Sequence, residues 1–73
     1  MARSYRSVVL HHRCVLNLTD GTAIEGVLWD ERGDLLVMRG AVLHESGAGG
    51  PVPMDGDIIV ERARLRFAQV LPS

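Results

Sequence analysis

The feature that most constrains the fold is an alternation of apolar and more polar side chains with a period of two, which begins at Cys14. Cys14, Leu16 and Leu18 share one face of this segment and are separated by Val15, Asn17 and Thr19. Such a period predicts a half-buried β-strand. The turn that follows contains Asp20-Gly21, a pair that suits two-residue hairpin loops because both positions tolerate positive φ.

The alternation returns in four later segments, each ended by a turn or a loop. We predict strands over Ala23–Asp30, Leu35–Val42, Asp57–Glu61 and Arg64–Leu71. Gly26 lies inside the first of these, where a glycine predicts a bend or the close approach of another backbone. Glu31–Asp34 is the predicted turn after that strand. The sequence therefore predicts five short strands, an all-β pattern typical of a small closed or nearly closed barrel.

Two segments depart from the strand pattern. In Ala2–His12 the residues Tyr5, Val8, Val9 and His12 fall at helical spacing, so we predict a short N-terminal helix there. Glu45–Gly56 contains four glycines and two prolines with little apolar content, which predicts a flexible loop.

The length and the net charge of the chain limit the classes of protein to which it can belong. A chain of 73 residues has room for one core, so we expect a single domain over residues 1–73. Its net charge of -1 removes the usual electrostatic argument for a dedicated nucleic-acid binder. No apolar run approaches the roughly 20 residues of a membrane helix, and no cleavable signal is recognisable at the start, so we expect no membrane partner.

The residues that could carry chemistry are few. Cys14 is the single cysteine, which excludes an internal disulfide framework, and its place on the inward face favours a small buried side chain. The adjacent His11 and His12 diverge in either a helix or a strand, so they cannot easily hold one ion. The acidic turn at Asp30, Glu31 and Asp34 lacks the spaced oxygen ligands of a calcium loop. We therefore predict no catalytic residue, no metal and no cofactor, and a protein that is not an enzyme.

The best candidates for a functional surface lie in the last two strands. Arg64 and Arg66 would share one strand face, where they could protect an exposed edge, contact a phosphate or meet an acidic partner. Trp29 fits either the core or an interface anchor, since tryptophan is enriched in binding hot spots. The full set of candidate interface residues is Trp29, Ile58, Val60, Leu65, Phe67, Arg64 and Arg66.

The segment from Leu18 to Leu28, with its Asp20-Gly21 turn and its Ile24, Gly26 and Leu28 spacing, resembles the first half of the Sm/LSM motif. The resemblance implies an Sm-like barrel of five strands after a short helix. It also implies a ring or another symmetric homo-oligomer, because Sm-like barrels pair strand four of one subunit with strand five of the next.

The same resemblance assigns the positions that contact RNA in the RNA-binding members, and they fall at Asp30, Asp34 and Arg62. Asp34 stands where those members carry an asparagine, so the amide donor is replaced by a negative charge. The glycine that follows the basic residue in the family is replaced by Ala63. RNA binding is therefore the alternative and not the first expectation.

A narrower resemblance concerns the layout of the chain. The opening Ala2-Arg-Ser-Tyr5, the Asp20-Gly21 hairpin and the ending Ala68-Gln-Val-Leu-Pro72 resemble small proteins encoded among the virion genes of tailed bacteriophages. This implies a non-enzymatic structural or assembly module of the particle, at the head, portal or capsid. Its partners would be further copies of itself and other virion proteins, in the virion and, during assembly, in the host cytoplasm. The alternative is a cytoplasmic RNA-binding Sm-like ring that acts as a chaperone or regulator.

Overall fold

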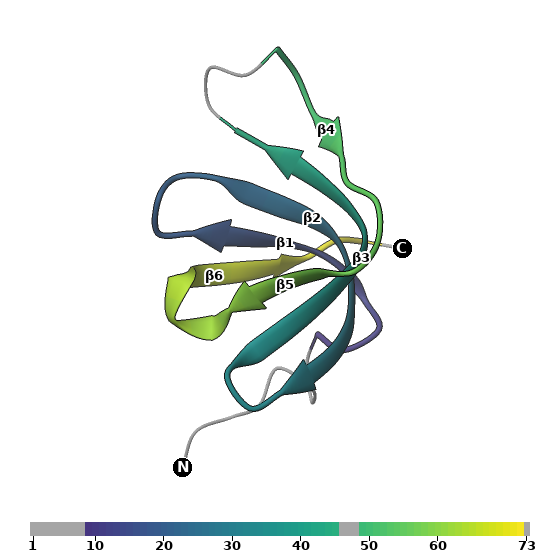
Figure 1. The fold of residues 1–73 in the computed structure, drawn as a ribbon, viewed down its shortest axis with the longest axis vertical. Helices are drawn as coiled ribbons and strands as arrows, with labels where there is room; N and C mark the ends of the chain where they lie inside the picture. Colours follow the sequence, from purple (N-terminus) through teal and green to yellow (C-terminus); the bar gives the residue numbers. More distant parts are fainter. Residues whose placement is uncertain (1–8, 46–48, 73) are drawn as a thin grey trace.

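The computed structural model describes residues 9–45 and 49–72, and the regular secondary structure of this part is almost entirely β-strand (Figure 1). A short 3-10 turn, η2 (Arg62–Arg64), separates the last two strands. The strands are β1 (Arg13–Leu18), β2 (Ala23–Arg32), β3 (Leu35–His44), β4 (Val52–Pro53), β5 (Ile58–Glu61) and β6 (Leu65–Val70). The predicted all-β class is confirmed.

All the strands belong to one antiparallel sheet with the order β4-β3-β2-β1-β6. The strand β5 lies off this path and pairs with the first half of β3, while β4 pairs with its second half. No ladder joins β5 to β6 among the described residues, so the sheet is open there rather than closed. The physical reason is η2, which turns the chain away from β5 and delivers β6 to β1.

The β1–β2 hairpin forms as the sequence predicts. Gly21 adopts a φ of 90°, which only glycine reaches without strain, and Asp20 stabilises the same turn. The Asp20 carboxylate accepts hydrogen bonds from the Thr22 amide at 3.0 Å and from the Thr22 hydroxyl at 2.7 Å. These bonds favour the charged carboxylate, and they lower the pKa of Asp20.

Two bulges between β2 and β3 bend this long hairpin around the core. In the first, Gly40 and Ala41 of β3 oppose the single residue Gly26, and Gly40 has a φ of 63°. In the second, Trp29 is the extra residue of β2 between the pairs Leu28–Met38 and Asp30–Val37. The predicted close approach at Gly26 is confirmed, because a Cβ there would lie 3.0 Å from the Arg39 carbonyl oxygen.

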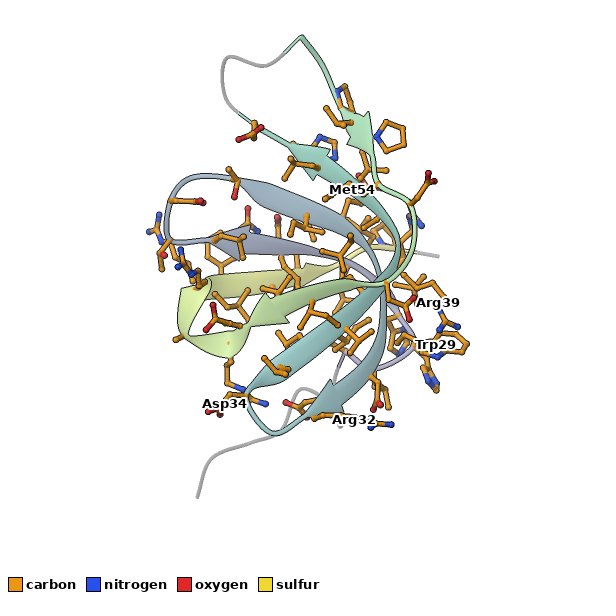
Figure 2. All side chains as sticks on the ribbon, in the orientation of Figure 1. Trp29, Arg32, Asp34, Arg39 and Met54 are labelled. Carbon is orange, nitrogen blue, oxygen red and sulfur yellow. The ribbon has the colours of Figure 1, made fainter. Side chains whose placement is uncertain are left out.

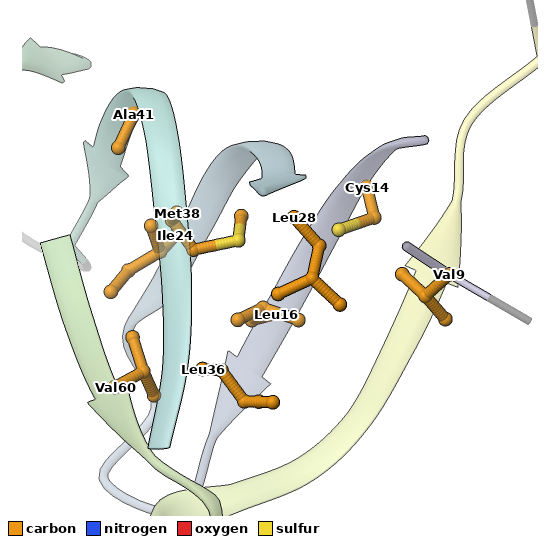
Figure 3. Packing of buried hydrophobic residues seen from close by; sticks show 9 residues of the cluster. All are labelled: Val9, Cys14, Leu16, Ile24, Leu28, Leu36, Met38, Ala41 and Val60. Atoms are coloured by element: carbon orange, nitrogen blue, oxygen red, sulfur yellow. The ribbon is translucent and has the colours of Figure 1, made fainter. Parts of the chain in front are cut away.

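The core lies on the concave side of the bent sheet (Figure 3). It contains the inward residues of β1, β2, β3 and β5, together with Val9 from the segment before β1. The buried apolar residues are Val9, Cys14, Leu16, Ile24, Leu28, Leu36, Met38, Ala41 and Val60. The inward position predicted for Cys14 is therefore confirmed, and Leu16 shares its face, while Ile24 and Leu28 face inward from β2.

The predicted N-terminal helix is not shown. Residues 2–8 of that segment lie outside the described residues, and Val9–His12 forms a turn. Its backbone groups bond to β2 instead of continuing a helix: the His11 amide donates to the Leu28 carbonyl at 2.7 Å. His11 also has a φ of 66°, which no helix contains.

The strand count of five is wrong, because the loop predicted over Glu45–Gly56 contains the short strand β4. Val52 pairs with Leu43 and Pro53 with Val42, at the outer edge of the sheet, where a missing proline donor is tolerated. The predicted turn Glu31–Asp34 is also shorter than expected, since β2 continues through Arg32. Over residues 9–45 and 49–72, no helix has the length and hydropathy needed to cross a membrane.

Candidate protein interface

The candidate site consists of two unpaired strand edges, which we call the open edges: β5 (Ile58–Glu61) and β6 (Leu65–Val70). Within the described residues, β5 pairs only with β3 and β6 pairs only with β1. Each strand therefore leaves one row of backbone N–H and C=O groups without a ladder partner. Such a row is a template for pairing with another chain.

The open edges carry exposed apolar side chains. Ile59 is 54% exposed, Phe67 49% and Val70 45%. Val70 pairs with the fully buried Cys14, so it belongs to the edge of the core that the open sheet leaves uncovered. Apolar surface beside unpaired backbone is what a partner strand would bury.

The residues that the sequence assigned to this interface differ in how far the structure exposes them. Phe67 is exposed on β6, whereas Ile58 and Leu65 are half-buried against the core. Val60 lies in the core, 5% exposed, where it pairs with Leu36.

Sequence reasoning missed Ile59 and Val70. The sequence predicted Ile58 and Val60 for the interface, but Ile58, Ile59 and Val60 are all apolar and do not show which face of β5 lies outward. The pairing of β5 with β3 settles the phase, because Val60 faces Leu36 and Ile59 faces the outer Val37.

Arg64 and Arg66 lie near the corner that η2 forms between β5 and β6, and they do not share one strand face as predicted. Arg64 belongs to η2 and not to a strand, and the ladder from β1 to β6 slips at Arg66. The two side chains therefore do not share a strand face, although both are exposed. Arg64 approaches Glu61 at 3.7 Å, an exposed pair that contributes little to stability.

Arg62 instead holds the corner between the open edges in place. Its side chain forms an ion pair with Glu31, whose side chain is only 5% exposed, and donates to the Gly33 carbonyl at 3.3 Å. Its amide donates to the Asp34 carbonyl at 2.8 Å. The β2–β3 turn is thereby joined to η2, and the relative direction of β5 and β6 is fixed.

The residues assigned to RNA by resemblance do gather near this corner. A surface pocket of about 310 Å³ is lined by Asp34, Leu35, Glu61, Arg62 and Ala63. Asp30 lies farther back along β2, where its carboxylate accepts hydrogen bonds from the Glu31 amide at 2.8 Å and from Arg32 Nε at 3.0 Å. Two carboxylates at the pocket, Asp34 and Glu61, stand against one arginine that already pairs with Glu31. This balance disfavours a phosphate chain.

Trp29 lies apart from the open edges, at the bulge of β2 (Figure 2). The guanidinium of Arg39 stacks over its ring, with Cζ 4.1 Å from the ring centroid. The indole remains 44% exposed. Of the two sequence interpretations, core or surface, the structure places Trp29 at the surface.

The cysteine and histidine side chains, which are the candidate ligands of a soft metal ion, do not form a metal site in the described residues. Cys14 is fully buried, and desolvation raises the pKa of its thiol. His44 lies at the end of β3, 3.1 Å from the Glu25 carboxylate, which also pairs with Arg13 at 3.2 Å. No group of three histidine, cysteine or acidic residues that could hold a metal ion occurs within residues 9–45 and 49–72.

No protein-family model matches the chain, and no curated protein sequence matches it.

Proposed function

We propose that the chain is a non-enzymatic assembly module that associates through its open edges. The proposal rests on one observation: β5 and β6 each have one unpaired edge, and Ile59, Phe67 and Val70 are exposed beside these edges. A closed monomer would satisfy the backbone groups of both edges. An open one gains from pairing β5 of one copy with β6 of the next, because the new ladder satisfies backbone groups and covers apolar surface.

The geometry of the edges favours a closed homo-oligomer. The two edges lie on different strands, so the contact joins unlike surfaces, and repeating it produces a ring if the rotation closes. The fixed corner at Arg62 and Glu31 supports one constant rotation per copy. This arrangement agrees with the Sm-like architecture that the sequence resembles.

The narrower proposal is that the module belongs to a tailed-phage particle, at the head, portal or capsid. The support for it is the resemblance in layout of the opening and closing segments together with a surface built for protein contacts. It predicts that mass spectrometry of purified particles detects the chain. Its absence from particles that contain the other structural proteins would contradict the virion role and leave the assembly role standing.

The test of the assembly proposal is the mass of the purified protein by light scattering, with the ratio of ultraviolet absorbances read for bound nucleic acid. We expect a nucleic-acid-free oligomer that Phe67→Glu or Ile59→Glu converts to monomer, because each places a charge in the paired edge. Val52→Glu is the matched control, since Val52 is equally exposed but lies on β4. A monomer at all concentrations would contradict the proposal.

The competing function is an RNA-binding ring, and the same experiment separates the two. An oligomer that carries RNA and loses it at higher salt would favour that function. Weaker RNA binding after Arg62→Ala supports it only if circular dichroism shows that the variant is still folded, since this arginine also pairs with Glu31. The pocket beside Arg62 is where such an RNA would have to bind.

A further inference from the structure

A second surface, away from the open edges, surrounds the single tryptophan of the chain. We call it the Trp29 platform and define it as Trp29, Arg39, His11 and Asp57. Trp29 is the extra residue of the β2 bulge, and Arg39 lies across from it on β3 (Figure 2). A bulge often re-aims a side chain beside a functional surface. Here it presents the largest side chain of the protein to solvent while the core is filled by smaller ones.

The platform is held in a fixed arrangement. Asp57 anchors the guanidinium of Arg39 through two bonds, from Nε at 3.0 Å and from Nη2 at 3.2 Å. These bonds lower the pKa of Asp57, so the carboxylate stays charged. In the turn before β1, the ring centroid of His11 lies 5.2 Å from that of Trp29, and the His11 amide donates a hydrogen bond to the Leu28 carbonyl. A preorganised aromatic group loses little conformational entropy when a partner binds.

Two of the polar groups that the platform offers to a partner are hydrogen-bond donors. The indole N–H of Trp29 and the Nη1 group of Arg39 have no acceptor among the described residues. A partner therefore has to supply acceptors next to an apolar group that can pack on the indole.

The charges around the platform are already balanced. Arg39 pairs with Asp57, Arg13 with Glu25, and Arg32 with Asp30. A phosphate chain needs cations that are not neutralised, and these arginines already have carboxylate partners. An uncharged segment of a partner therefore suits the balanced charges around the Trp29 platform better than a charged one.

We propose that the Trp29 platform binds an extended, proline-containing segment of a partner protein. In the polyproline II conformation the backbone carbonyls make no internal hydrogen bonds, so they can accept from Trp29 and Arg39. A proline ring can pack on the exposed part of the indole, as in other aromatic sites for such segments. The inference rests on the proposed function only in that the chain acts through protein contacts; it assigns a second surface and a different partner.

The experiment uses the fluorescence of Trp29, which reports on the platform alone because it is the only tryptophan. The probe is a decaproline peptide titrated into the full chain, with a glycine–serine peptide of the same length as control. We expect a saturable blue shift with decaproline only. Arg39→Ala should weaken binding by about two- to fivefold, which is the contribution of an exposed cation–π contact.

Two variants separate this proposal from the assembly proposal. Trp29→Ala should abolish the peptide-induced shifts of backbone amide resonances and leave the oligomer mass unchanged. Phe67→Glu should change the mass and leave peptide binding intact. An emission spectrum that does not change up to about 1 mM decaproline would mean a Kd too weak for a specific site, and it would overturn the inference. An equal response to oligouridine, or a response to protein dilution without peptide, would also overturn it, in favour of nucleic acid or of a second copy.

Discussion

At the scale of single residues, the fold depends most on places where a backbone comes too close for a side chain. Gly26 is such a place: a Cβ there would lie 3.0 Å from the Arg39 carbonyl oxygen and 3.2 Å from the Ala41 Cα. Both are backbone atoms, so neither can rotate away as the end of a side chain could. The bend of β2 across β3 therefore requires glycine at this position.

Gly26→Ala should lower the free energy of unfolding by about 1–3 kcal/mol, because the β2–β3 contact has to widen. Chemical denaturation measures the change. Gly49→Ala is the matched control, since a Cβ at Gly49 meets nothing within 4 Å. Equal stability of the two variants would contradict the close approach at Gly26.

The burial of Cys14 leads to a second prediction about a single residue, which concerns the reactivity of its thiol. Its side chain is fully buried, and the loss of solvation raises the pKa of the thiol above its ordinary value. Since the thiolate is the reactive form, the native protein should react with a thiol reagent far more slowly than the unfolded chain at the same mildly alkaline pH. Timed alkylation followed by mass spectrometry checks this, and rapid labelling of the native protein would show that the core opens at Cys14.

At the scale of elements, the corner between β5 and β6 depends on one ion pair. The second bulge shifts the alternation of β2 by one position, so that Glu31 instead of Asp30 faces inward. A buried carboxylate requires a partner, and Arg62 of η2 supplies it. The bulge, the ion pair and the direction of the open edges are thus one connected feature.

Arg62→Ala should destabilise the fold by about 3–5 kcal/mol, because it removes the cation that pairs with the buried Glu31 carboxylate. Thermal or chemical unfolding measures the loss. Arg64→Ala is the control from the same turn, and its exposed pair with Glu61 predicts a change below about 1 kcal/mol. If the two variants were equally stable, the corner would not depend on the Glu31–Arg62 pair.

At the scale of the whole molecule, the open sheet leaves a small core only partly covered. If the open edges pair as we propose, assembly would cover part of the exposed surface of Ile59, Phe67 and Val70. Such assembly would link the stability of the fold to protein concentration by mass action.

The midpoint of thermal unfolding should accordingly rise with protein concentration, and Phe67→Glu should remove most of that dependence. Calorimetry over a wide range of concentration measures both effects. A midpoint that does not change with concentration in the unmodified chain would mean that the monomer carries all of the stability.

The sequence by itself determined the local features of this protein. The period of two identified β1 and β2, their inward faces and the β class, and the residues of the Asp20-Gly21 turn marked the first hairpin, because these properties depend on neighbours along the chain. The candidate interface followed only in part: Phe67 and Trp29 are exposed, whereas Val60 is in the core.

Tertiary structure decided the rest. The bulges at Gly40 and Trp29 shift the alternation only when β3 pairs with β2, and the phase of β5 depends on β3. The gap between β5 and β6, and hence the open edges, depends on which strands pair at long range. A periodicity measured along one strand carries no information about the strand that lies beside it. The sequence therefore pointed to the last two strands, whereas the exposure of Ile59 and Val70 at their edges emerged only from the folded chain.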